Sequence, residues 1–185
     1  MKPIQYHIDT SHLENIAEEY ISSILQKSGL LVAKPKFDIR GTDLILFRDM
    51  KDGIKFCRVQ CKGRSFVYSS KQSARIHKDY VSNGFVFILY LLFSQTRQDI
   101  YIFFPTDIEK WNLTNRNEYE ISLYKTNVEY KLSSYRFNDK KIAVIDTIIE
   151  RAELSNEFQR VVYGSGAASL PKPICNAIGS QTNNH

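Results

Sequence analysis

The chain has 185 residues, which is enough for one domain with a sizeable hydrophobic core and an extension. Its apolar content of 43% and charged content of 24% are ordinary for a soluble globular protein. Its 25 Lys and Arg residues outnumber its 20 Asp and Glu residues, and the resulting net charge of +5 fits an anionic partner without requiring one.

Cysteine usage and apolar runs argue against several classes of protein. The cysteines Cys57, Cys61 and Cys175 form no CxxC pair, which argues against a zinc site made by cysteine spacing. Their odd number and the lack of an apolar signal segment in residues 1–11 indicate a reducing compartment. The longest apolar run, residues 85–93, is too short to cross a bilayer as a helix. We therefore expect a cytoplasmic protein that does not contact membranes.

The first predicted element is an amphipathic helix over residues 11–29. Apolar side chains recur there at three-then-four spacing, at Leu13, Ile16, Ala17, Tyr20, Ile21, Ile24 and Leu25. Ser11 and Glu14 have the spacing of a capping box, and Gly29 suits the C-terminal cap.

A hairpin and two further strands follow. Residues 42–63 are predicted to form two antiparallel strands around a turn at Asp52-Gly53. Residues 69–84 predict a short polar helix or a loop. The continuous apolar run 85–93 predicts a strand buried on both faces, residues 99–105 another strand, and residues 106–111 a short helix.

The sequence changes character after Trp111, where polar and aromatic residues mix. A last helix is predicted over residues 140–162. We divide the chain into a core over residues 1–110, an extension over 111–163 that packs on the core, and a flexible tail over 164–185. The order of elements predicts an α/β protein with a mixed sheet.

Three polar residues, Asp43, Gln60 and Lys62, occur inside the strand-like runs of the hairpin. Because strand side chains alternate between faces, Cys57, Val59 and Cys61 share one face, and Phe56, Arg58, Gln60 and Lys62 share the other. Asp43 begins the first strand, whereas Gln60 and Lys62 end the second, so antiparallel pairing makes the three neighbours. They form either a site or the polar rim of an exposed hairpin. Asp38 is predicted to cap a turn with Gly41.

The helix with Glu18, then Gly29, then "GTD" and "QCK" resembles the PD-(D/E)xK nuclease superfamily over residues 11–110. The likeness is to its restriction-endonuclease-like and archaeal Holliday-junction-resolvase-like branches. It implies a restriction-endonuclease-like core, with a mixed β-sheet flanked by helices, and we expect an α+β C-terminal extension beyond it. Thr42 replaces the proline of the motif and Gln60 replaces its acid, although several branches carry QxK.

The resemblance also implies a site. The catalytic residues would be Glu18, Asp43, Gln60 and Lys62. Mg²⁺ or Mn²⁺ would be held by Glu18, Asp43, Gln60 and the backbone carbonyl of Cys61, and Lys62 would orient the attacking water or stabilise negative charge.

Basic residues follow the motif. Arg64 lies directly after it, and Lys71, Arg75 and Lys78 would share one face of a helix. These four residues are predicted to bind DNA phosphates. Alternatively, Lys71, Arg75 and Lys78 form a solvated helix face without a binding role.

We consider three hypotheses about the function of this protein. The first is a metal-dependent DNA endonuclease that hydrolyses phosphodiester bonds in repair, recombination, restriction or a mobile element. The second is a catalytically inactive nuclease-fold protein that binds nucleic acid, which Gln60 favours. The third is an interaction module in which the 112–163 region and the tail form a homodimer.

Overall fold

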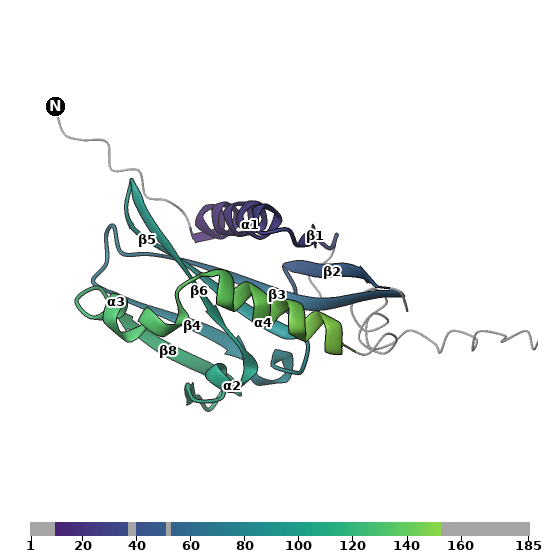
Figure 1. The fold of residues 1–185 in the computed structure, drawn as a ribbon. Helices are drawn as coiled ribbons and strands as arrows, with labels where there is room; N and C mark the ends of the chain where they lie inside the picture. Colours follow the sequence, from purple (N-terminus) through teal and green to yellow (C-terminus); the bar gives the residue numbers. More distant parts are fainter. Residues whose placement is uncertain (1–9, 37–39, 51–52, 153–185) are drawn as a thin grey trace, which may run out of the picture.

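The computed structural model describes residues 10–36, 40–50 and 53–152 (Figure 1). The predictions for Asp38, Asp52, Cys175, the last part of the extension and the tail over 164–185 fall outside these residues. The helices are α1 (Thr10–Lys27), α2 (Pro105–Ile108), α3 (Val128–Lys131) and α4 (Asp139–Arg151), with 3-10 turns η1 (Lys78–Tyr80) and η2 (Ser133–Tyr135). The strands are β1 (Leu31–Ala33), β2 (Leu44–Met50), β3 (Gly53–Ser65), β4 (Lys71–His77), β5 (Phe85–Ser94), β6 (Arg97–Phe103), β7 (Asn112–Leu113) and β8 (Glu118–Tyr124).

Two sheets are formed by the described strands. The larger sheet has the order β1-β2-β3-β5-β6, in which β3 and β5 are parallel and the other neighbours are antiparallel. The smaller sheet has the order β4-β8-β7 and is antiparallel. The protein is thus an α/β fold with a mixed sheet flanked by helices, as predicted.

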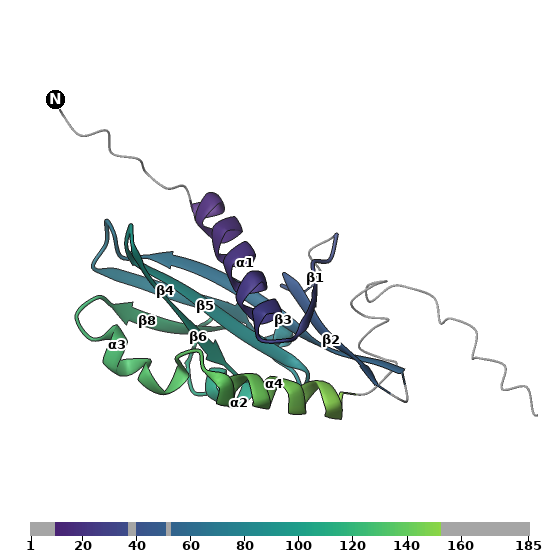
Figure 2. The same cartoon turned by 45° about the horizontal axis from the view of Figure 1, so that its top comes forward.

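Strand β5, an inner strand of the larger sheet, is covered on both faces. Its side chains alternate between two buried clusters. Val86, Ile88, Tyr90 and Leu92 pack with α1 and α4 on one face of the larger sheet, whereas Phe85, Phe87, Leu89, Leu91 and Phe93 pack with the smaller sheet and α2 and α3 on the other (Figures 1 and 2). A strand covered on both faces reads as a continuous apolar run, which is why the sequence predicts it correctly.

The predicted first helix, hairpin, strands of residues 85–93 and 99–105 and short helix are confirmed. The hairpin closes with Met50 opposite Gly53, as the turn signal predicts. Gly29 has a φ of +85° and donates to the carbonyl of Gln26, so it ends α1 as expected. The predicted last helix is present as α4, but it ends at Arg151, because Ala152 has an extended backbone. Residues 153–162 of its predicted range lie outside the described residues.

The prediction of a helix or loop over residues 69–84 is wrong for residues 71–77. Residues 71–77 form β4, in which Ala74 and Ile76 point inward while Lys71 and Arg75 point outward. The strand exists because it pairs along its whole length with β8, more than 40 residues later in the chain. This pairing also joins segments on both sides of residue 110, and the proposed domain boundary there stays a prediction.

Helix α1 lies unusually close to β3 at one residue. A Cβ added at Gly63 would lie 2.8 Å from the carbonyl oxygen of Leu13 and 3.2 Å from the Cβ of Ala17. Glycine is therefore required for this approach, which brings the acidic side chains of α1 to the end of β3.

Within the described residues, no helix combines the length and the apolar character that a membrane crossing needs.

The buried thiols provide a first test of the core. Burial raises the pKa of Cys57 to about 12, and burial, aided by nearby carboxylates, raises the pKa of Cys61 well above its ordinary value. In a Cys175→Ser background, iodoacetamide at about pH 8 should label neither thiol in the folded protein, because the thiolate is the reactive form. Mass spectrometry should show both labelled in guanidinium, and rapid labelling without denaturant would contradict the core.

The same shift predicts a pH dependence of stability. The neutral Cys57 thiol contributes fully below its ordinary pKa of 9.0, and this contribution is lost as the pH rises from there towards about 12. Urea titrations across this range should show a smaller alkaline loss of unfolding free energy in Cys57→Ala than in the unsubstituted protein.

The contact of α1 with β3 predicts that Gly63→Ala is destabilising. Its added methyl group must displace helix backbone, so the free energy of unfolding should fall by about 1–3 kcal/mol in urea titrations. Ser23→Ala, on the exposed side of α1, is the control and should change it by less than about 0.5 kcal/mol. Equal stability of the two variants would show that the helix can move away freely.

Candidate functional site

The hairpin strands separate at one end, and we call residues 42–43 and 60–62 at this place the fork. Leu44 pairs with Val59, and the backbone N–H of Asp43 still donates to the Val59 carbonyl at 2.9 Å. Beyond this point β3 continues to Ser65 beside β5. One backbone edge of β3 therefore faces side chains instead of β2.

Asp43 covers the first part of this edge. Its Oδ2 accepts a hydrogen bond of 2.7 Å from the backbone N–H of Cys61. Because the N–H and C=O of one strand residue point to the same side, the Cys61 carbonyl also points to the open edge. The hairpin thus brings the Asp43 carboxylate beside a backbone acceptor of the QxK segment.

Gln60 lies against Gly41 and Tyr80. A Cβ at Gly41 would be 2.8 Å from Nε2 of Gln60 and 2.9 Å from the Tyr80 ring, and the φ of Gly41 is +64°. Among the described residues, Oε1 of Gln60 and Oγ1 of Thr42 are buried oxygens without a hydrogen-bond partner. Buried acceptors of this kind are costly unless a water molecule or an ion meets them.

The alternation predicted for β3 is confirmed on its core side. Cys57, Val59 and Cys61 are buried in the cluster beneath α1. Lys62 leaves the strand on the opposite side, yet its Nζ lies 2.6 Å from Oε1 of Glu14 on α1. The Lys62 side chain therefore reaches the helix around the open edge of β3.

The predicted helix carboxylate, Glu18, lies one turn after Glu14. Its Oε2 is 2.7 Å from Nζ of Lys34, and its side chain is 16% exposed. Burial raises the pKa of Cys61, and the charges of Asp43 and Glu18 raise it further. Glu18 has Lys34 as its ion-pair partner and lies one turn along α1 from Glu14, which contacts Lys62.

Sequence reasoning missed Glu14 and Lys34 as part of this arrangement. The capping-box interpretation of Glu14 is wrong, because its carboxylate pairs with Lys62 and Arg64 and Ser11 lies within the helix. The i, i+4 spacing of Glu14 and Glu18 places both on one helix face and was an available signal.

The basic residues after the motif have mixed surroundings. Arg64 is largely enclosed, since its guanidinium donates to the carbonyls of Gly63 and Ser73 and contacts Glu14. Lys71 lies over the Tyr124 ring, and Arg75 pairs with Glu120 at 2.8 Å. Lys71 and Arg75 share the outward face of β4, but Lys78 belongs to η1, so the predicted shared helix face of these three is wrong.

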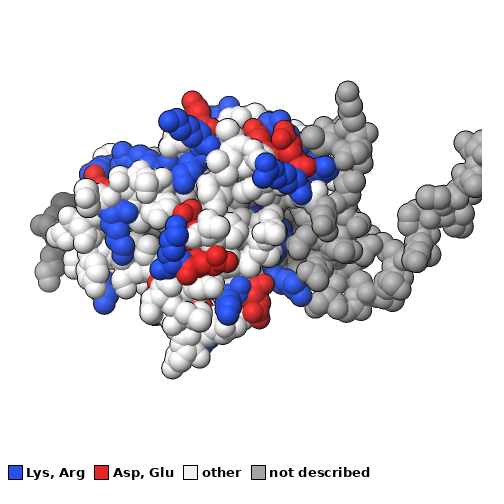
Figure 3. All heavy atoms as spheres, turned by 60° about the horizontal axis from the view of Figure 1, so that its bottom comes forward, with Lys and Arg blue, Asp and Glu red and all other residues white. Residues whose placement is uncertain are grey.

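The face of the molecule that carries β8 and α2 shows Lys and Arg side chains interspersed with Asp and Glu (Figure 3). Among the described residues, Arg97 pairs with Glu129 and Arg136 pairs with Asp99. The positive charge of the chain therefore does not form a continuous surface in this view.

The fork carries oxygen atoms of the kind that bind hard divalent cations. Within the described residues no three His, Cys, Asp or Glu side chains form a metal cluster, so a cation would also need amide and carbonyl oxygens. The fork offers these in the unpartnered Oε1 of Gln60 and the edge-facing carbonyl of Cys61, beside the Asp43 carboxylate. Mg²⁺ and Mn²⁺ prefer such oxygen ligands.

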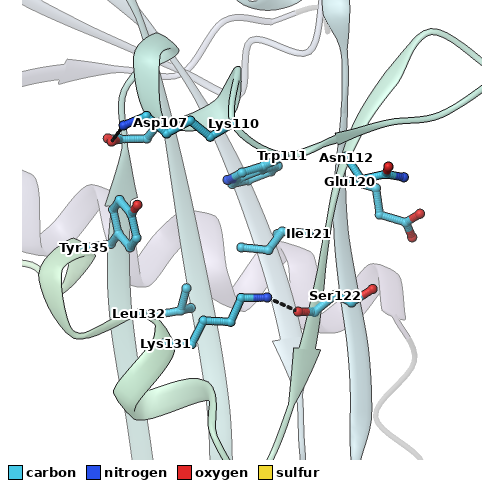
Figure 4. Close-up of a pocket in the computed structure, with 10 residues that line it drawn as sticks. All are labelled: Asp107, Lys110, Trp111, Asn112, Glu120, Ile121, Ser122, Lys131, Leu132 and Tyr135. Carbon is cyan, nitrogen blue, oxygen red and sulfur yellow. Dashed lines mark hydrogen bonds and ion pairs between the residues drawn. The ribbon is translucent and has the colours of Figure 1, made fainter.

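Two cavities lie away from the fork. A groove of about 500 Å³ between α2, β8 and η2 has Trp111, Ile121 and Leu132 among its lining residues, and Lys131 donates across it to the Ser122 carbonyl (Figure 4). A second cavity of about 800 Å³ lies between α4 and the start of β5. Neither of these two cavities is lined by a fork residue.

Comparison with known proteins shows a similarity in fold to a nuclease. No family model matches the chain, and no curated protein matches its sequence. Among solved structures it is similar to a bacterial homing endonuclease, I-Ssp6803I, with a TM-score of 0.50 and 16% identity. The alignment covers 75% of this chain and 93% of that chain. At this identity the likeness is one of fold, and the chain shares the α/β architecture of that endonuclease.

Proposed function

We propose that the fork is the catalytic centre of a metal-dependent DNA endonuclease of the PD-(D/E)xK superfamily. The observation that carries this proposal is the convergence of Asp43, Gln60 and Lys62 at the open end of one hairpin, beside the carboxylates of α1. The fold shared with a homing endonuclease supports it. The substrate would be DNA, approached at the exposed edge of β3.

The metal site would draw on residues of the fork and of α1. Asp43 and Glu18 would supply carboxylates, Gln60 its side-chain carbonyl, and Cys61 its backbone carbonyl. A bound Mg²⁺ or Mn²⁺ supplies a Lewis acid that polarises the phosphate and lowers the pKa of water. Because Gln60 brings no negative charge, we expect weak affinity for Mg²⁺ and better use of Mn²⁺.

Lys62 would act on the reacting phosphate. Its side chain is 25% exposed, and its ammonium lies 2.6 Å from the Glu14 carboxylate. A positive group fixed at this place would orient the attacking water or stabilise the charge that develops on the phosphate oxygens. Phosphates farther along the DNA would contact Lys71, Arg75 and Lys78, whereas the enclosed Arg64 is better suited to supporting the site.

We also propose that the protein is cytoplasmic and that it forms a homodimer through the 112–163 region. Sedimentation would measure this oligomeric state.

Replacing Lys62 tests the proposal directly. Plasmid, linear duplex, single-stranded and four-way-junction DNA should be incubated with Mg²⁺ or Mn²⁺, and cleavage should fall by about 100-fold or more in Lys62→Ala. The matched control is Lys140→Ala, which removes the same charge from an exposed position on α4 and should cleave normally.

Two outcomes would contradict this proposal. Cleavage that survives Lys62→Ala unchanged would place the activity elsewhere. Salt-sensitive DNA binding without cleavage would instead favour the inactive, nucleic-acid-binding reading, because phosphate contacts alone produce such salt dependence.

The neutral ligand at Gln60 gives a second test. Gln60→Glu adds a carboxylate to the site and should tighten Mn²⁺ binding by about tenfold, because affinity for hard cations rises with ligand charge. Gln60→Leu removes the oxygen and should weaken binding. Calorimetry on the protein without DNA measures both effects, and Gln26→Glu, on the exposed side of α1, is the control for added charge. Equal affinities in all three variants would exclude a cation at Gln60.

A further inference from the structure

One oxygen of Glu14 binds two basic groups at the end of β3. Its Oε1 lies 2.6 Å from Nζ of Lys62 and 3.3 Å from NH1 of Arg64. The Glu14 and Arg64 side chains are only 31% and 17% exposed. This contact is therefore more enclosed than a typical surface ion pair, whose long side chains remain mobile.

Arg64 is fixed by contacts other than Glu14. Its Nε donates to the carbonyl of Ser73 on β4 at 2.6 Å, and its NH1 donates to the carbonyl of Gly63 at 2.7 Å. The planar guanidinium group of Arg64 is thus held between β3 and β4, with one N–H donor directed at Glu14. Arg64 joins the two sheets and presents a fixed positive group to the carboxylate.

The backbone of Glu14 is fixed as well. The carbonyl of Leu13, the preceding residue, lies 2.8 Å from the position that a Gly63 Cβ would occupy. Helix α1 thus packs closely on β3 here, and Leu13 and Ala17 are buried in the cluster beneath it. Glu14 is consequently held at both ends, by its helix and by Arg64.

Lys62, in contrast to Arg64, has a flexible four-carbon chain and no rigid, planar set of donors. A catalytic ammonium must be held close to one position, since a misplacement of about 1 Å can cost about 100-fold in rate. Glu14 is the carboxylate that the structure places against this ammonium. Glu18, by comparison, pairs with Lys34.

We infer that Glu14 is a positioning residue for Lys62, anchored by Arg64. This inference rests on the proposed nuclease function. Glu14 contacts neither the phosphate nor the metal ion. It acts by holding the Lys62 ammonium at the open edge of β3, at the place where the scissile phosphate binds.

The test is Glu14→Gln, which keeps the shape of the side chain and removes its charge. We expect kcat for DNA cleavage to fall by about 10- to 100-fold while KM stays within about threefold, because Lys62 keeps its charge but loses its position. Glu14→Asp, which keeps the charge, should recover part of the rate. Glu109→Gln, an exposed residue after α2, is the control and should leave both constants unchanged.

A double variant separates positioning from a general structural role. If Glu14 acts through Lys62, Glu14→Gln should reduce the residual rate of Lys62→Ala no further. NMR of the Lys62 ammonium gives a readout that does not need DNA. Its proton signals should be protected from exchange in the unsubstituted protein and broadened in Glu14→Gln, with circular dichroism showing that the variant is folded.

Each outcome is decisive. Cleavage by Glu14→Gln at the full rate, an effect on KM alone, or an equal loss in the Lys62→Ala background overturns the positioning role and leaves the nuclease function standing if Lys62→Ala is inactive. If the unsubstituted protein cleaves no DNA, the proposed function fails and the positioning role fails with it.

Discussion

Strand β3 is longer than its neighbour β2, and the candidate site depends on this difference in length. Pairing with β2 stops at Val59, opposite Leu44, whereas β3 continues to Ser65. The backbone of β3 needs other partners along that edge, because backbone N–H and C=O groups are rarely left unpaired. The Asp43 carboxylate meets the Cys61 N–H, and the helix carboxylates and Lys62 occupy the space beyond. Polar residues at this end of the hairpin are thus the consequence of an edge that none of the described strands covers.

Both helix α1 and the smaller sheet contact this end of β3. Gly63 admits α1 close to the strand, which brings Glu14 and Glu18 to the fork. On the other side, Arg64 reaches the Ser73 carbonyl and fixes the smaller sheet to the same place. The site is therefore built from segments that lie far apart in sequence and are held together by a glycine contact and one guanidinium.

The sequence predicted what local periodicity determines. Alternation along the hairpin placed Asp43 beside the QxK segment, because register and pleat follow from a single turn. It could not predict β4, a polar segment that becomes a strand only by pairing with β8. It also missed the pairing of Glu14 with Lys62 and of Glu18 with Lys34, since the rotation and approach of α1 depend on tertiary packing at Gly63.

The charged side chains around the fork pair with one another. Glu14 pairs with Lys62 and Arg64, and Glu18 and Glu19 both pair with Lys34. Ion-paired groups attract a further isolated dication or phosphate less strongly than free charges do. Under the proposed function, a bound dication would leave an excess of positive charge that favours the phosphate, and the phosphate would favour the dication to the same extent. Metal and DNA should therefore bind cooperatively, which restricts the assembled centre to the complex with DNA.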